Sequence, residues 1–334
     1  MSERNLTLDN YKKQTLFLTA TLFCLLFYAF LGKLSSLIPE SFPLVSLVNQ
    51  EQLDLISANH YFIFLQTHIL MLVGLTSVFI VEALILGWDN SSIKSISNFS
   101  TPSARTDVFY IWLRMSGLSD VLFNLFFLGS GFFLLSKIEH YSLIKLNNYF
   151  LEFIFTALGV TFFHYVYHRV IHHKYFWELH KLHHAATEMS IFTASREHPL
   201  VISASNILLV IPPALFGAST EVIFTYFGLQ GIYNMFIHSR VDLFPSWAKF
   251  MITTKDHHIH HSIESEHYLC NYGMVLSIWD RIFGTYYDPK KAGAIEFGIE
   301  DKNYAQASYF KEIFFICFRW IKQLASNLRP TNPS

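Results

Sequence analysis

The chain has 334 residues, of which 52% are hydrophobic, 17% are aromatic and 15% are charged. Because soluble domains carry about 25% charged residues, this composition indicates a protein that lies largely in a membrane. The net charge of −1 and the lack of a basic stripe with interleaved aromatic residues argue against a nucleic-acid partner. The three cysteines are scattered without a CxxC pair, which argues against a disulfide framework or a thiolate metal site.

Six apolar segments are candidates for membrane insertion. Residues 14–32 form an uncharged run long enough to cross the roughly 30 Å hydrocarbon layer. A cleaved signal peptide has a shorter apolar core, so we interpret this run as a retained span. The other candidates lie at 61–86, 117–136, 149–170, 200–217 and 221–238. The last two are short for full crossings and are also compatible with a hairpin that enters the bilayer from one side.

Lysine and arginine placement predicts the orientation. With four full spans, one hairpin and a cytoplasmic amino terminus, every histidine cluster falls on the cytoplasmic side. We therefore predict an all-α fold, a multi-span helical membrane bundle with a cytoplasmic histidine-rich helical cap. The helix-like stretch 305–325 is expected to lie on the membrane surface or to pack on the cap. The location is compatible with a plasma or inner membrane and with the endoplasmic reticulum.

Histidine is concentrated in one part of the chain, since 14 of 17 lie between His164 and His267. Three clusters have short spacings, namely His168 and His172, then His180, His183 and His184, then His257, His258, His260 and His261. Residues three and four apart share one face of a helix, so we expect each cluster to aim two or three imidazoles at one point. Imidazole binds zinc, copper, iron and nickel as the neutral base. His258 points off the face shared by His257 and His261, and the other eight imidazoles exceed what one tetrahedral zinc takes. This number predicts that the cap holds a dimetal centre, or one ion with further histidines around it.

Isolated polar residues are interpreted differently. We expect surface or hydrogen-bonded roles for His60, His68, His140 and His267. The few acids near the clusters are candidates for orienting the imidazoles, namely Glu178, Glu188, Glu197 and Asp256.

The clusters and their surroundings resemble the fatty acid hydroxylase superfamily, which includes sterol desaturases, sterol methyl oxidases and alkylglycerol monooxygenases. HRVIHH at 168–173, WELHKLHHA at 177–185 and DHHIHHS at 256–262 are similar to its three histidine boxes. The resemblance continues, in family order, through REHP (196–199), IHSRVDL (237–243), NYG (271–273) and WDRIFGT (279–285). It covers roughly 105–288 and suggests three parts: membrane spans and a polar loop at 1–104, a hydroxylase-like catalytic domain at 105–288, and a cytoplasmic or surface-lying tail at 289–334.

The resemblance implies two iron ions, dioxygen as co-substrate, a lipid substrate from the bilayer and a separate electron-transfer protein. The implied catalytic metal ligands are His168, His172, His180, His183, His184, His257, His260 and His261, with His238 as a further ligand. Some relatives have another histidine four residues before His238, where this chain has Asn234. NYG and WDRIFGT are interpreted as segments that hold the third box in place.

Several residues are placed around the ligands rather than among them. They are Asn234, acting through a water, and His164, His173, His198 and His258. His173 also competes with His172 for the ligand role, and the latter is favoured. His164 is compatible with a role beside the ligands or with a satisfied core position.

The predicted function is hydroxylation or desaturation of a lipid whose class the sequence does not specify; ether cleavage and the oligomeric state also stay open. A histidine-rich metal transporter, a haem-binding electron carrier and a zinc hydrolase are the alternatives. A transporter would distribute histidines along its spans, and a haem carrier would place axial pairs inside the bundle.

Overall fold

The computed structural model describes residues 74–97, 101–116, 142–241, 249–301 and 309–327, together with residues 72, 99, 118 and 304. Several predictions fall outside the described residues: the span at 14–32, the first part of 61–86, nearly all of 117–136, and His60, His68 and His140.

The described part of the chain is helical, with no strand and two isolated bridges. Besides the helix Gly74–Leu86, the α-helices are α3 (Ser92–Ser97), α4 (Pro102–Met115), α7 (Tyr149–Ile171), α8 (Trp177–His184), α9 (Pro199–Leu215), α10 (Thr220–Ile237), α11 (Thr254–His260), α12 (Ile278–Ile282) and α13 (Tyr309–Asn327). Short 3-10 turns are η2 (Trp88–Asn90), η3 (Ile191–Ser195), η5 (Ser265–His267) and η6 (Pro289–Lys291). The all-α prediction is confirmed for these residues.

Helix α7 is the long apolar element of the described residues. Among them it is the one helix whose length and composition suit a membrane crossing, while Gly74–Leu86 and α9 are apolar but shorter. The Asn148 side chain caps its start by accepting from the Leu151 N–H. Its 23 residues measure about 35 Å at 1.5 Å per residue, enough for the hydrocarbon layer.

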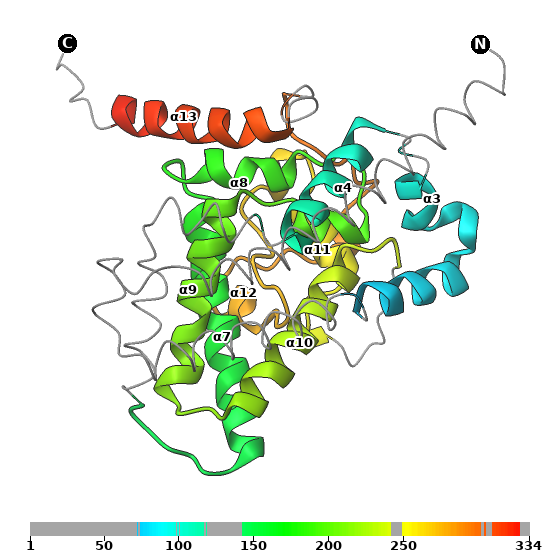
Figure 1. The fold of residues 1–334 in the computed structure, drawn as a ribbon. Helices are drawn as coiled ribbons and strands as arrows, with labels where there is room; N and C mark the ends of the chain where they lie inside the picture. The colour runs from blue at the N-terminus through cyan, green and yellow to red at the C-terminus, as the bar shows by residue number, and fades with distance from the viewer. Residues whose placement is uncertain are drawn as a thin grey trace, which may run out of the picture.

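Helices α7, α9 and α10 lie side by side along much of their length (Figure 1). Gly159 allows α7 to approach α9 closely, because a Cβ at this position would lie 2.7 Å from the Cβ of Pro212. Below about 3 Å two such carbons clash, so a glycine is required for this spacing. Helices α7 and α10 end, and α9 begins, at the same end of the molecule (Figure 1).

A hydrophobic core lies at the carboxyl end of α7 and joins it to α4, α8 and α13. Leu113, Leu182 and Ile316 are among its fully buried members. Helix α13 lies across this end of the molecule (Figure 1). It packs on the core through one face, while Phe314 and Phe318 on another face are exposed. Helix α13 therefore packs on α4 and α8, and its placement on a membrane surface stays a prediction.

Candidate metal centre

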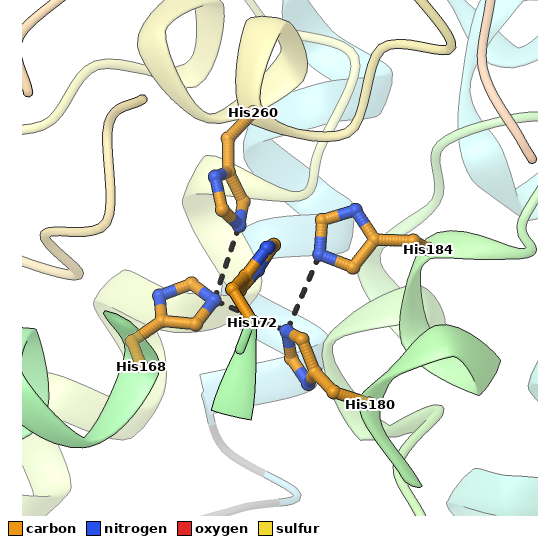
Figure 2. A group of neighbouring side chains, drawn as sticks. All are labelled: His168, His172, His180, His184 and His260. Atoms are coloured by element: carbon orange, nitrogen blue, oxygen red, sulfur yellow. Dashed lines mark hydrogen bonds between the residues drawn. The ribbon is translucent and has the colours of Figure 1, made fainter. Parts of the chain in front are cut away.

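Nine buried or half-buried histidines meet where the carboxyl ends of α7, α8, α10 and α11 converge. They form two groups. Within each group, one ring nitrogen of every histidine lies within 4.8 Å of those of the others. The five-histidine group consists of His168, His172, His180, His184 and His260. The four-histidine group consists of His183, His238, His257 and His261. Figure 2 shows the rings of the five-histidine group pointing toward a common centre from α7, α8 and α11.

Helical spacing sorts the histidines between the two groups. Residues four apart stay together, as His180 and His184 do in the five-histidine group. The intervening His183 belongs to the four-histidine group. The same spacing rule holds at α11 with the two groups exchanged: His257 and His261 belong to the four-histidine group, and His260 belongs to the five-histidine group. Each HxxHH box thus aims two rings at one group, as expected, while its third histidine, His183 or His260, turns to the other group because positions i+3 and i+4 diverge around the helix axis.

Close nitrogen contacts define the five-histidine group. The Nε2 atom of His168 lies 3.1 Å from Nε2 of His180 and 3.1 Å from Nε2 of His260. The Nε2 atoms of His184 and His180 are 3.2 Å apart. Neighbouring ligands held at metal–nitrogen distances of about 2.0–2.1 Å in octahedral or tetrahedral geometry lie about 2.8–3.4 Å apart.

The tautomers of two of these rings show which of their nitrogens are free to bind a metal ion. Nδ1 of His168 is 2.8 Å from the carbonyl oxygen of Tyr272, and Nδ1 of His260 is 2.7 Å from that of Cys270. A carbonyl only accepts, so each Nδ1 carries the proton and each Nε2 presents a lone pair. The two lone pairs then face each other across 3.1 Å, which is repulsive unless a cation lies between them. The donor set therefore fits a metal ion.

The four-histidine group follows the same logic. Nδ1 of His238 donates to the carbonyl of Asn234 at 2.7 Å, so its Nε2 presents a lone pair. That Nε2 lies 2.9 Å from Nε2 of His257 and 3.3 Å from Nε2 of His183. Nε2 of His261 is 3.1 Å from Nε2 of His257. This group, too, has the spacing of ligands around one ion.

The loop that follows α11 supplies the carbonyls that orient the five-histidine group. Asp280 accepts from the N–H groups of Tyr272 and Gly273, both at 2.8 Å. Asn271 adopts a positive φ of 52°, and its side chain bonds the backbone of Asp256. These contacts fix the loop.

Burial keeps the histidines neutral. Desolvation lowers the pKa of His180, His184 and His260 well below the usual value of 6.5, and for each of them a neighbouring histidine is the next cause. A neutral imidazole is the form that binds a metal, so the site has ligands ready at physiological pH.

The residues predicted to surround the ligands occupy several environments. His164 is half-buried beside His168, with 5.4 Å between ring centroids. His173 is exposed and its ring contacts the ring of Tyr175, whereas His172 lies in the five-histidine group. Asn234 orients His238 through its backbone carbonyl.

Two further predicted residues contact other segments. His258 donates to the carbonyl of Ser239 at 3.0 Å, next to His238. His198 contacts α13 through the carbonyl of Ile313 at 3.0 Å, and this bond ties the start of α9 to the cap.

The acids expected to orient the imidazoles bond elsewhere. Glu178 pairs with Arg319 at 2.6 Å, and Glu188 pairs with Arg240 at 3.0 Å. Asp256 closes a capping box with Thr253 at the start of α11. Glu197 is surrounded by protein, and desolvation raises its pKa to about 7. Backbone carbonyls perform the orienting role for His168, His238 and His260.

A buried ion pair was not predicted. Arg196 and Asp107 are fully buried, with 3.2 Å between Nη1 and Oδ1. Arg196 also donates to the carbonyls of Leu182 and Ala185, which flank His183 and His184. The charged residues of REHP and α4 thus hold the carboxyl end of α8, and the REHP motif was the one sequence signal for it.

Comparison with known proteins agrees with this geometry. Residues 153–285 match the family model described as fatty acid hydroxylase. This match assigns the segment 153–285 to the fatty acid hydroxylase superfamily. The matched segment begins in α7 and ends just after α12, so it contains all nine histidines.

Curated relatives in this superfamily have names that describe lipid oxidation. Over 136 residues, 39% of this chain, it is 33% identical to human alkylglycerol monooxygenase and covers 29% of that protein. It is 29% identical to the ornithine lipid hydroxylase OlsE of Rhizobium tropici, over 41% of this chain and 42% of the relative. It is also 29% identical to a putative methylsterol monooxygenase of Dictyostelium discoideum, over 39% of this chain and 49% of the relative. The matches thus span less than half of these relatives, and no solved structure matches the chain.

Proposed function

We propose that this protein is a membrane-bound lipid hydroxylase whose two histidine groups each hold one iron ion. The observation that carries the proposal is the pair of inward-facing lone pairs on His168 and His260, which a cation would satisfy. Nine imidazoles in two groups exceed the ligand set of a zinc hydrolase. Membership of the superfamily supports iron over other metals that imidazole binds.

A membrane location is supported by the outer faces of the described helices. Leu158, Val166 and Val170 expose large apolar side chains along α7, as do Ile80 and Leu84 on the helix Gly74–Leu86. Exposed apolar surface of this extent fits contact with lipid. We propose a multi-span bundle with the histidine-rich cap on the cytoplasmic side.

When bound, the iron pair would supply the oxidising chemistry, with one substrate C–H bond, one O₂, two electrons and two protons giving one C–OH group and one water. The chain's residues position the ions and exclude bulk water. Each of His168, His238 and His260 keeps its proton on Nδ1 by donating to a carbonyl, so Nε2 stays available to metal. Electrons would come from a separate protein, and the lipid would enter from the bilayer.

The test uses the full chain, purified with its metal, and a panel of alkylglycerols, aminoacyl lipids and methylsterols. Wild-type protein should carry about two irons per chain and add one oxygen atom to one lipid class. His260→Ala and His183→Ala, one from each group, should lose iron and turnover together. His173→Ala is the matched control because this exposed histidine lies outside both groups, and it should keep both.

Loss of two hydrogens instead of gain of oxygen would assign desaturation. Active protein without iron, or full activity in either group variant, would refute the proposal. A Soret band would instead support the haem carrier.

A further inference from the structure

Glu82 is a fully buried carboxylate near the end of the apolar helix Gly74–Leu86. It accepts from the backbone N–H of Ser92 at 2.7 Å and from the Ser92 hydroxyl at 2.9 Å. Its Oε1 also accepts from the backbone N–H of Arg240 at 2.8 Å. Burying a charged carboxylate is costly unless hydrogen bonds compensate it, and these three bonds do so. Glu82 lies outside the matched segment 153–285, which gives it no assigned role.

The bond from Arg240 reaches the turn that carries His238. Helix α10 ends at Ile237, so the direction of the His238 ring depends on how this turn is held. The turn is fixed at Ser239, whose carbonyl accepts from His258, and at the Arg240 N–H by Glu82. The Arg240 guanidinium adds bonds to the carbonyl of Met189 and to Glu188.

The five-histidine group has a different support. Its rings are oriented by the carbonyls of Tyr272 and Cys270, in the loop that Asp280 holds. Within the part of the chain that the structure describes, Glu82 bonds to Ser92 and Arg240 and not to that loop. The two groups therefore have separate outer supports.

We infer that Glu82 is a positioning residue for the four-histidine group, acting through the Arg240 backbone on His238. This inference rests on the proposed function, because it assumes that each group holds one ion. It assigns part of the metal centre to the amino-terminal segment, outside the recognised domain. Outer supports of metal ligands typically change metal affinity by about 10–100-fold.

The experiment titrates metal-free full-length protein in detergent with Co²⁺, followed by calorimetry and by visible absorption of the bound ion. Wild-type protein should bind two ions, and Glu82→Ala should keep one tight site and weaken the other by at least about tenfold. Glu152→Ala is the matched control. Glu152 is also buried and accepts from a backbone N–H, that of Ser219, but at the opposite end of α10 from His238.

Combined variants identify which site is lost. Adding His257→Ala to Glu82→Ala should leave the one tight site intact, whereas adding His260→Ala should abolish it. Asp280→Ala should weaken the other ion, the one bound by the five-histidine group. Glu82→Gln is the milder variant if Glu82→Ala does not fold, because a glutamine oxygen replaces one of the two carboxylate acceptors.

Two tight sites in Glu82→Ala would overturn the inference while leaving the proposed function intact. Equal weakening of both sites in the folded Glu82 variant would also overturn it, because Glu82 would then support the whole fold. A wild-type protein that binds fewer than two ions would overturn the proposed function and this inference together.

Discussion

Replacing Asp107 with alanine tests whether its buried ion pair with Arg196 stabilises the fold. Both side chains are completely buried, and the Asp107 carboxylate also accepts from the hydroxyls of Ser190 at 3.0 Å and Thr193 at 2.6 Å. Asp107→Ala leaves the guanidinium buried without its counter-charge. Breaking such a pair by removing one partner costs about 3–5 kcal/mol, so we expect the free energy of unfolding to fall by about that amount.

The double variant separates the ion pair from its surroundings. Arg196→Met removes the uncompensated charge, so the double variant should lose less than the two single losses added together. We expect a coupling free energy of about 2–3 kcal/mol. The measurement is unfolding of metal-free protein in mixed micelles by titration with a denaturing detergent. Metal-free protein is used so that lost metal binding does not add to the result.

An exposed pair provides the control. Lys94 and Asp89 approach to 2.5 Å, but their side chains are 46% and 77% exposed. Exposed pairs contribute about 0–1 kcal/mol, so the corresponding Asp89→Ala and Lys94→Ala cycle should show weak coupling. Additivity within about 0.5 kcal/mol in the buried cycle would refute the reasoning.

Two further predictions concern pH and the loop after α11. Desolvation lowers the pKa of His198 to about 4 from 6.5, so its contribution to stability is present above pH 6.5 and is lost as the pH falls toward 4. Between pH 4 and 7, the free energy of unfolding should therefore rise with pH more steeply in wild type than in His198→Asn, by up to the slope that corresponds to one bound proton. Parallel curves would contradict this. Gly273→Ala would place a Cβ 2.5 Å from the Leu276 carbonyl, in the loop that orients His168, whereas Gly293→Ala meets nothing within 4 Å. For Gly273→Ala we expect a free energy of unfolding lower by about 1–3 kcal/mol, measured by denaturation, and about tenfold weaker metal binding, measured by Co²⁺ titration. Gly293→Ala should show neither change. Unchanged Co²⁺ binding in Gly273→Ala would count against the orienting role of the loop.

The sequence predicted the helical class and the convergence of the histidine segments, because helical periodicity acts within one short segment. It did not predict how the rings of each box divide between two groups, since that depends on the angles at which α7, α8, α10 and α11 meet. Neither did it predict the groups that orient the rings. Every residue has a backbone carbonyl, so nothing in the sequence distinguishes those of Asn234, Cys270 and Tyr272.

Long-range polar contacts were also beyond prediction. Glu82 is visible in the sequence as a charge within an apolar run, and a charge in such a place usually marks function. Its partner Arg240 lies 158 positions away, and no local rule connects the two. The same holds for Arg196 and Asp107, which are 89 positions apart.

The division of neighbouring histidines between the groups has a mechanical consequence. His183 and His184 are adjacent in the chain but belong to different groups, and so do His260 and His261. Each adjacent pair joins the two groups through one peptide unit, whose planarity and fixed bond lengths limit relative movement. Two such links, from α8 and α11, fix the spacing of the groups more firmly than either helix alone would. If each group holds one ion, as proposed, the outer supports, including Glu82 and Asp280, would govern how firmly each ion is held while these two links keep the distance between the groups constant.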